Sequence, residues 1–207
     1  MPTLTLFGKL RTRNLLAVLI IAGVLPRVFA ASPVCVGAPA PEYADSEASA
    51  EAATPGLSPA ARMLDITLSL DTAAPASGAE LRLGNAHGGR LSLSGTATVL
   101  AFENGEWLIR GDRHRRQFTA PAANPLSAGP RTLAARVRLD AGGAPVRVER
   151  LTADGRPLSF GGMDGDMLLA WLDPRRFDAF KVVSRGGAGG VSASVNFYAD
   201  GTLMILR

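Results

Sequence analysis

The stretch that decides the fold is Met63-Leu64-Asp65-Ile66-Thr67-Leu68-Ser69-Leu70-Asp71. Its leucines and isoleucine alternate with Asp, Thr and Ser. Successive side chains of a β-strand point to opposite faces, so this pattern places the large apolar groups together on one face. A helix would spread the same groups around its axis. The stretch therefore predicts a strand with one face on a core and the other toward solvent.

Similar alternation recurs along the chain. Between Arg131 and Leu139, the apolar residues Leu133, Ala135 and Val137 alternate with Thr, Ala and Arg, which predicts a second strong strand. Shorter runs of the same kind predict strands at 80–83, 89–93, 96–102, 106–110, 146–151, 180–184, 191–198 and 202–206.

Hairpin-turn signals separate several of these runs. They are Asn104-Gly105, Gly142-Gly143, Asp154-Gly155 and Asp200-Gly201. Such pairs tolerate the positive φ angles of tight two-residue turns and so predict antiparallel hairpins. Roughly a dozen short strands at this spacing predict an all-β fold, either an antiparallel β-sandwich or a barrel.

The segment from Met167 to Leu172 does not alternate, because it is apolar at every position. We interpret it as a strand buried between two layers, which favours the two-sheet sandwich over a single open sheet. Asp173-Pro174 follows directly and has the residues of a helix N-cap and first helical position. It predicts one short helical turn through about Phe177.

The N-terminus has the order of segments found in a secretory signal. Basic residues precede an apolar run from Leu15 to Leu25, and Val28-Phe29-Ala30 resembles a cleavage site. A membrane-spanning helix needs about 20 apolar residues, so this run is too short for one. We expect residues 1–30 to be a cleavable signal peptide and the mature protein to be periplasmic, cell-surface or secreted, without a membrane span.

Residues 31–61 are dominated by Ala, Pro, Ser, Gly and Glu and contain no basic residue. This composition predicts a disordered acidic linker and leaves 62–207 as the folded β-sandwich domain. Cys35 is the single cysteine of the chain, so no internal disulfide is available. We interpret Cys35 as a bystander in the linker. Ser32-Pro33-Val34 before it is unsuited to a lipoprotein anchor.

Charge argues against nucleic acid as a partner. Four of the 22 basic residues lie within residues 1–30, which contain no acid, so 18 basic and 18 acidic residues remain after cleavage. A neutral mature protein has no bulk attraction for nucleic acid or anionic lipid. The basic cluster 110–116 is expected to be a solvated loop.

One part of the chain resembles a known group of folds. Between Thr132 and Leu158, two predicted strands surround Gly142-Gly143 and are followed by Asp154-Gly155-Arg156-Pro157-Leu158. This run resembles concanavalin A-like and laminin G-like jelly-roll sandwiches, and residues 176–182 are similar to a near-terminal strand of such domains. The resemblance implies a jelly-roll β-sandwich. Lectins, glycan hydrolases and structural modules share that fold, so it implies no single function.

The sequence offers little for catalysis. It has two histidines, His87 and His114, no G-x-S-x-G motif and no His or Cys pair at zinc-ligand spacing. His87 lies in a Gly-rich stretch, and we expect it to be a solvent-facing turn residue. Glu103 and Glu106 flank Asn104-Gly105, which is the pattern of a hairpin tip. We therefore favour a protein without enzymatic activity, and no catalytic residue is predicted.

Calcium is the one cofactor that the sequence leaves open. Asp164 and Asp166 surround a glycine and are followed by Asp173, and such oxygen ligands suit calcium. No complete calcium-loop pattern is present, so we interpret these carboxylates as solvated turn residues.

A glycan surface would need an aromatic ring beside polar groups, because sugar rings stack on aromatic side chains. Trp107 and Tyr198 lie on alternating strands and Arg110 is near Trp107, so these three are the candidate ligand residues. The first hypothesis is an exported, non-catalytic module that binds a carbohydrate. A structural or adhesive module of the cell envelope that binds a partner protein is the second hypothesis, and a glycan hydrolase or lyase is the third.

Overall fold

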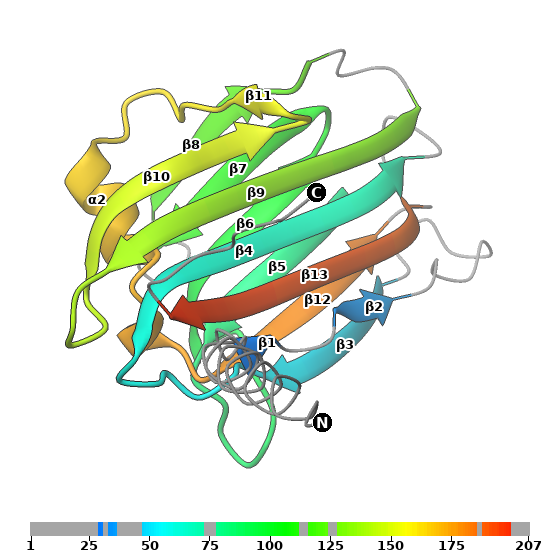
Figure 1. Ribbon diagram of the computed structural model, residues 1–207. Coiled ribbons are helices and arrows are strands. Elements are labelled where there is room, and N and C mark those ends of the chain that lie inside the picture. The colour runs from blue at the N-terminus through cyan, green and yellow to red at the C-terminus, as the bar shows by residue number, and fades with distance from the viewer. Residues whose placement is uncertain are drawn as a thin grey trace, which may run out of the picture. The chain divides into compact units, whose positions relative to one another are not determined.

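The computed structural model contains two antiparallel β-sheets packed face to face (Figure 1). The structure describes residues 29–30, 33–36, 47–72, 78–111, 116–123, 128–185 and 188–199. The predicted fold class, an all-β antiparallel sandwich, is confirmed.

The seven-stranded sheet is built around the alternating stretch from Met63 to Asp71. Ile66 of β4 pairs with Val195 of β13 on one side and with Ala135 of β9 on the other. The strands follow the order β1 (Phe29–Ala30), β13 (Ala188–Ala199), β4 (Ala61–Thr72), β9 (Gly129–Leu139), β10 (Pro145–Ala153) and β11 (Arg156–Pro157), and β2 (Val34–Val36) also pairs with β13. Both long predicted strands therefore lie at the centre of this sheet.

The six-stranded sheet lies behind the first one in Figure 1. Its strands follow the order β3 (Glu47–Ala53), β12 (Ala179–Arg185), β5 (Gly78–Gly84), β6 (Thr96–Glu103), β7 (Glu106–Gly111) and β8 (Arg116–Pro121). Consecutive strands β5 to β8 form a meander. The strand β8 had no sequence prediction.

Two of the predicted hairpin turns follow the sequence rule, whereas the turn at Gly142-Gly143 is a longer loop with positive φ at Gly143 alone. Asn104 has φ 51° and Gly105 has φ 79°, and Asp154 and Gly155 have φ 51° and 75°. Positive φ at both central residues gives the twist that two-residue hairpins require. These two turn predictions are confirmed, whereas Asp200-Gly201 lies outside the described residues.

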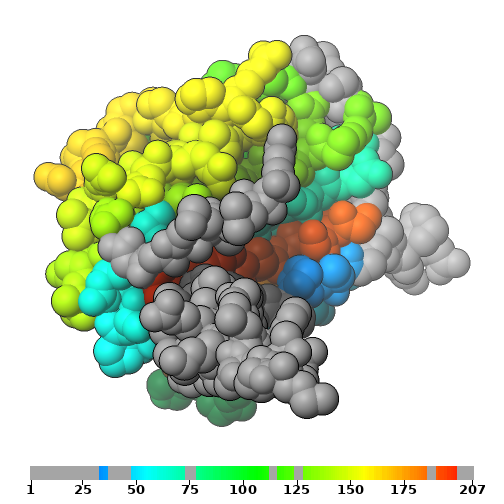
Figure 2. Space-filling model, in the orientation of Figure 1, coloured from blue at the N-terminus to red at the C-terminus, as the bar shows by residue number. Residues whose placement is uncertain are grey.

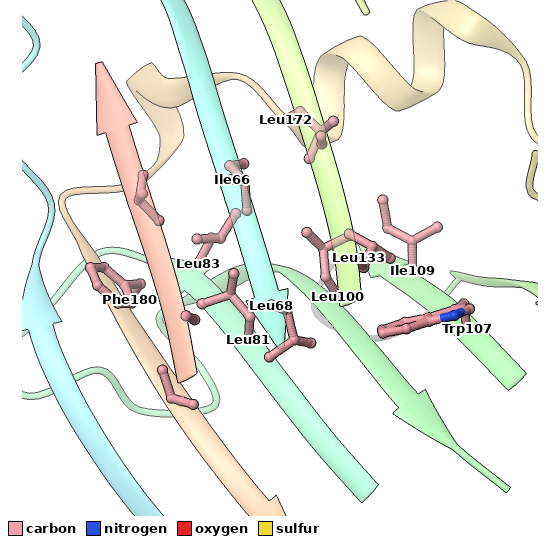
Figure 3. Packing of buried hydrophobic residues seen from close by; sticks show 14 of the residues in the cluster. Ile66, Leu68, Leu81, Leu83, Leu100, Trp107, Ile109, Leu133, Leu172 and Phe180 are labelled. Carbon is pink, nitrogen blue, oxygen red and sulfur yellow. The ribbon is translucent and has the colours of Figure 1, made fainter. Parts of the chain in front are cut away.

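The core fills the space between the sheets (Figure 3). Ile66 and Leu68 of β4 face Leu81 and Leu83 of β5, and all four are fully buried. Trp107 belongs to the same core and lies beside Ile109 in Figure 3, with its ring in edge contact with Phe102 at a centroid distance of 5.0 Å. The alternating apolar positions of both sheets therefore supply one continuous core.

The segment 167–172 is a helix, which corrects the prediction of a buried strand. The helix α2 spans Gly165–Trp171, and the Asp164 carboxylate caps it by accepting the Met167 N–H at 2.6 Å. Met, Leu and Ala favour a helix, and the segment has no β-branched residue. The 3₁₀ helix η1 (Pro174–Arg176) follows, with Asp173 as its N-cap, so the predicted short turn is confirmed.

Two further expectations differ from the structure. Residues 89–93 form a loop with a single bridge between His87 and Arg90, because Gly88 and Gly89 take positive φ angles there. Part of the predicted linker 31–61 is ordered, since β3 pairs along its whole length with β12. Its alternating alanines pack on the core. The sequence did not indicate this packing, because the segment has almost no large apolar side chain.

Some predictions concern residues that the structure does not describe. The signal peptide at 1–30, apart from Phe29–Ala30, and the strand at 202–206 lie outside the described residues. No helix among the described residues has the length and apolar composition needed to cross a membrane. Figure 2 shows the surface of β10 and α2 at one margin of the domain. A cleft of about 320 Å³ is lined by residues of β10, of α2 and of the segment that joins them.

Candidate functional site

The three predicted ligand residues lie in three different environments. Trp107 has no exposed surface, so its ring cannot stack on a sugar. Arg110 lies on the opposite face of the same strand, the outer face of the six-stranded sheet. Tyr198 belongs to β13 of the other sheet, where burial, with a smaller effect of the nearby Asp65 charge, raises its pKa. The structure therefore does not bring them together as one site.

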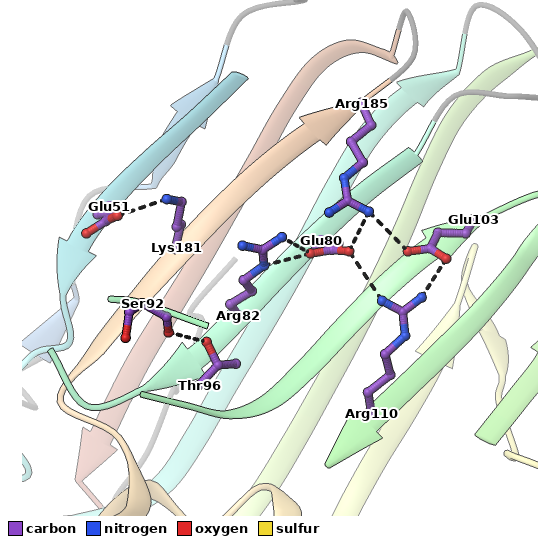
Figure 4. Close-up of polar contacts among 9 residues, drawn as sticks. All are labelled: Glu51, Glu80, Arg82, Ser92, Thr96, Glu103, Arg110, Lys181 and Arg185. Carbon is purple, nitrogen blue, oxygen red and sulfur yellow. Dashed lines mark hydrogen bonds and ion pairs between the residues drawn. The ribbon is translucent and has the colours of Figure 1, made fainter. Parts of the chain in front are cut away.

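An ion-pair network occupies the outer face of the six-stranded sheet (Figure 4). Glu80 is at its centre, with a side chain only 3% exposed. Its carboxylate accepts the Arg82 Nε at 2.7 Å and contacts Arg185 at 2.9 Å and Arg110 at 3.3 Å. Glu103 also pairs with Arg110, at 2.5 Å. Arg110 is thus part of a charged network and not a lone cation.

Strand register explains why Glu80 recruits arginines from both sides. Its cross-strand neighbours are Val183 and Ala101, which are apolar and buried. The carboxylate therefore sits in an apolar row and needs partners from adjacent rows, because an unpaired buried charge is costly. Burial opposes ionisation of Glu80, but the charges of Arg82 and Arg185 outweigh it and lower its pKa.

A cleft of about 1230 Å³ opens at one end of this sheet. Three separate segments form it: the β5–β6 loop, the start of β8, and η1. The residues that line it are Asn85, His87, Ser92, Ser94, Gly95, Thr96, Ala97, Arg116, Arg175 and Arg176. Nearly all of these side chains can form hydrogen bonds, so the cleft is a polar site.

The β5–β6 loop is held in one shape by its own hydrogen bonds. The Ser92 and Ser94 hydroxyls lie 2.9 Å apart, and the Thr96 hydroxyl donates to the Ser92 carbonyl at 2.9 Å. Glu51 accepts the Leu91 N–H at 3.0 Å, and this bond is the main cause of its lowered pKa. The loop is therefore a preorganised wall of the cleft.

Sequence-predicted polar residues take modest roles here. His87 is an exposed turn residue, as expected, and it also lines the cleft. Asp164 is occupied as the cap of α2, and no group of three or more His, Cys, Asp or Glu gathers as a metal site among the described residues. The calcium candidates Asp164 and Asp166 stay a prediction. Most of the basic cluster, 112–115, lies outside the described residues.

Sequence reasoning missed the cleft because its walls are far apart in the chain. No local pattern joins Ser92 to Arg175. One usable signal existed for the strand β7: Trp107 and Arg110 are three residues apart, and an odd spacing places them on opposite faces of a strand.

No family model and no curated protein matches this chain. Solved structures with a similar arrangement are distant in sequence. The CBM2 module of the Lactobacillus casei BL23 phage J-1 evolved Dit is 14% identical, with 81% of this chain and 77% of that one covered and a TM-score of 0.42. The legume lectin-like domain from Entamoeba histolytica is 10% identical, with 82% and 90% covered and a TM-score of 0.43. The Ruminococcus gnavus IT-sialidase CBM40 bound to alpha2,6 sialyllactose is 17% identical, with 66% and 77% covered and a TM-score of 0.38.

Proposed function

We propose that this chain is an exported, non-catalytic β-sandwich module that binds a carbohydrate in the cleft beside the β5–β6 loop. The observation that supports the proposal is the lining of that cleft. Asn85, Ser92 and Ser94 present amide and hydroxyl groups. Such groups both donate and accept hydrogen bonds, as sugar hydroxyls do.

The size of the cleft supports an oligosaccharide as ligand. Its volume of about 1230 Å³ lies above the roughly 300–1,000 Å³ of most small-molecule sites. Several sugar units would therefore fit along the loop wall.

The lining also favours binding over hydrolysis. Glycoside hydrolysis uses two carboxyl groups about 5 to 10 Å apart. No Asp or Glu lines the cleft among the described residues. Glu80 and Glu103, on the outer face of the same sheet, are both engaged by arginines.

Calorimetric titration of the full mature chain against a panel of neutral and acidic oligosaccharides tests the proposal. Trp quenching is unsuitable, since Trp107 and Trp171 are both buried. We expect saturable binding that weakens roughly fivefold in Asn85→Ala, because one hydrogen bond contributes about 1 kcal/mol. The matched control is Ser159→Ala, an exposed residue of the other cleft.

Three results would count against the proposal. No binding of any oligosaccharide in the panel would favour the alternative of an adhesive module that binds a partner protein. Binding that is equally strong in Asn85→Ala and in the control would place the ligand elsewhere. Release of shortened sugars during incubation would make the chain an enzyme.

A further inference from the structure

Three arginines from two separate segments line the cleft. Arg175 and Arg176 of η1 line it, together with Arg116 at the start of β8. No carboxylate lines the cleft among the described residues. A hydroxyl-rich neutral sugar does not need this excess of positive charge.

Arg175 is held in place from outside the cleft. Its Nε and one terminal nitrogen donate to the Asp173 carboxylate at 2.9 and 2.6 Å. Asp173 is buried and also caps η1 by accepting the Arg175 N–H at 3.0 Å. A guanidinium has five N–H donors, so this pairing leaves a terminal edge of the fork available. The side chain is 53% exposed, which gives a ligand access to that edge.

Arg176 is fixed by a different partner. One terminal nitrogen donates to the Ala170 carbonyl in the last turn of α2, at 2.8 Å. This bond orients the guanidinium and does not neutralise its charge. The guanidiniums of two consecutive residues of η1 are therefore fixed before a ligand arrives, which reduces the entropic cost of binding.

Three acidic residues that hold the walls of the cleft, Asp173, Asp178 and Glu51, are not part of its lining. Asp173 neutralises Arg175 in part. Asp178 accepts the Ala86 N–H at 2.8 Å, and Glu51 accepts the Leu91 N–H and pairs with Lys181. These two carboxylates hold the loop backbone and are not part of the lining. Among the described residues that line the cleft, arginines carry the charge and no carboxylate does.

We propose that the cleft selects an acidic sugar, whose carboxylate or sulfate group is bound by Arg175 and Arg176. Guanidinium groups suit such anions because their planar fork donates two parallel hydrogen bonds. This inference rests on the proposed carbohydrate function and names the class of sugar.

The test compares four probes with the full mature chain by calorimetry. They are an oligogalacturonate, the same oligosaccharide after reduction of its carboxyl groups, a sulfated oligosaccharide, and inorganic sulfate alone. We expect the oligogalacturonate or the sulfated sugar to bind at least about tenfold more tightly than the reduced one, since charged hydrogen bonds are roughly twice as strong as neutral ones. Whichever acidic probe binds more tightly identifies the anionic group.

Variants locate the effect. The double variant R175Q/R176Q should lose the preference for the acidic sugar and keep weak binding of the reduced one. R176Q alone removes a single carbonyl contact, so it tests the site even if the double variant folds poorly. The control R147Q/R156Q removes the same charge from β10 and β11 of the other sheet and should behave as the wild type.

The outcomes distinguish the acidic-sugar inference from the proposed carbohydrate function. Equal binding of the acidic and the reduced sugar, or an acidic preference that survives in both R176Q and R175Q/R176Q, overturns the acidic-sugar inference and leaves carbohydrate binding standing. Binding of inorganic sulfate without any sugar supports the anion site and overturns the carbohydrate function. No binding of any probe overturns both.

Discussion

The two sheets use their outer faces differently. On the seven-stranded sheet, the outward residues of β4 and β9, such as Thr67, Ser69 and Arg136, are half-buried. On the six-stranded sheet every residue of β5 is buried, including Glu80 and Arg82. The strand β5 alternates apolar and polar residues as β4 and β9 do, so the alternation alone does not set the exposure of the polar face.

Long arginine side chains explain the difference. Val99 lies between Arg82 and Arg110 in cross-strand register, and Val183 lies beside Glu80. Arginine stems can lie along apolar surface while their charged ends find partners. The six-stranded sheet therefore has a layer of charged side chains over an apolar floor, which Val99 and Val183 form. The outer face of the other sheet is polar and carries no such layer over β4 and β9.

The largest expected effect comes from breaking the centre of that layer. Glu80→Gln leaves three guanidiniums around a neutral side chain in a buried position, and such a loss costs about 3–5 kcal/mol of unfolding free energy. Asp65→Asn breaks the Asp65–Arg136 pair on the other sheet, where Arg136 is 39% exposed, and should cost less than about 1 kcal/mol. Urea denaturation of both variants measures the difference. Similar losses would show that the two faces are equivalent.

A smaller effect is expected from the apolar floor. Val183→Ala removes two methyl groups from a fully buried site and should cost about 2 kcal/mol. Thr67→Ala on the outer face of β4 should change stability by no more than about 0.5 kcal/mol. Thermal unfolding of both variants checks this, and a Val183→Ala variant as stable as Thr67→Ala would mean that the arginines do not seal the floor.

The sequence could predict the strands more readily than their surroundings. The alternation from Met63 to Asp71 and the turn at Asn104-Gly105 are local signals, and both led to the observed structure. The prediction of a strand at 167–172 was wrong, because a short, wholly apolar run fits a buried strand and a helix equally well. The strand predicted at 80–83 does not show that Glu80 and Arg82 are buried, because their burial depends on arginines from other strands.

The candidate site was less predictable than the fold for the same reason. A polar cleft needs Ser92, Arg116 and Arg175 to converge from three parts of the chain, and no spacing rule links them. The aromatic residue chosen from the sequence, Trp107, is core because its strand face is the one that carries Ile109. Both tryptophans, Trp107 and Trp171, are buried in the interior. The cleft is formed instead by polar loops at the end of the sheet.

The most gradual effect concerns acid. The pKa of Glu80 is lowered because, although burial opposes its charge, the guanidiniums outweigh that effect. A carboxyl whose pKa is lower in the folded state stabilises the fold above its unfolded pKa, near 4.5, and that contribution disappears as pH falls through the folded value. The wild type should lose stability below about pH 4.5, and Glu80→Gln should show a flatter profile.

Salt makes this last comparison sharper. Glu149 on the seven-stranded sheet also has a lowered pKa, chiefly through its hydrogen bond from Arg147, but it is solvent-exposed. Glu149→Gln should flatten the acid profile at low ionic strength and not at 1 M salt, because the Debye length falls to about 3 Å there. The effect of Glu80→Gln should persist at 1 M salt, since buried pairs are screened much less. Urea denaturation between pH 3 and 6 at both salt concentrations measures this, and a Glu80→Gln effect that salt removes would mean that solvent reaches the network as freely as it reaches the other face.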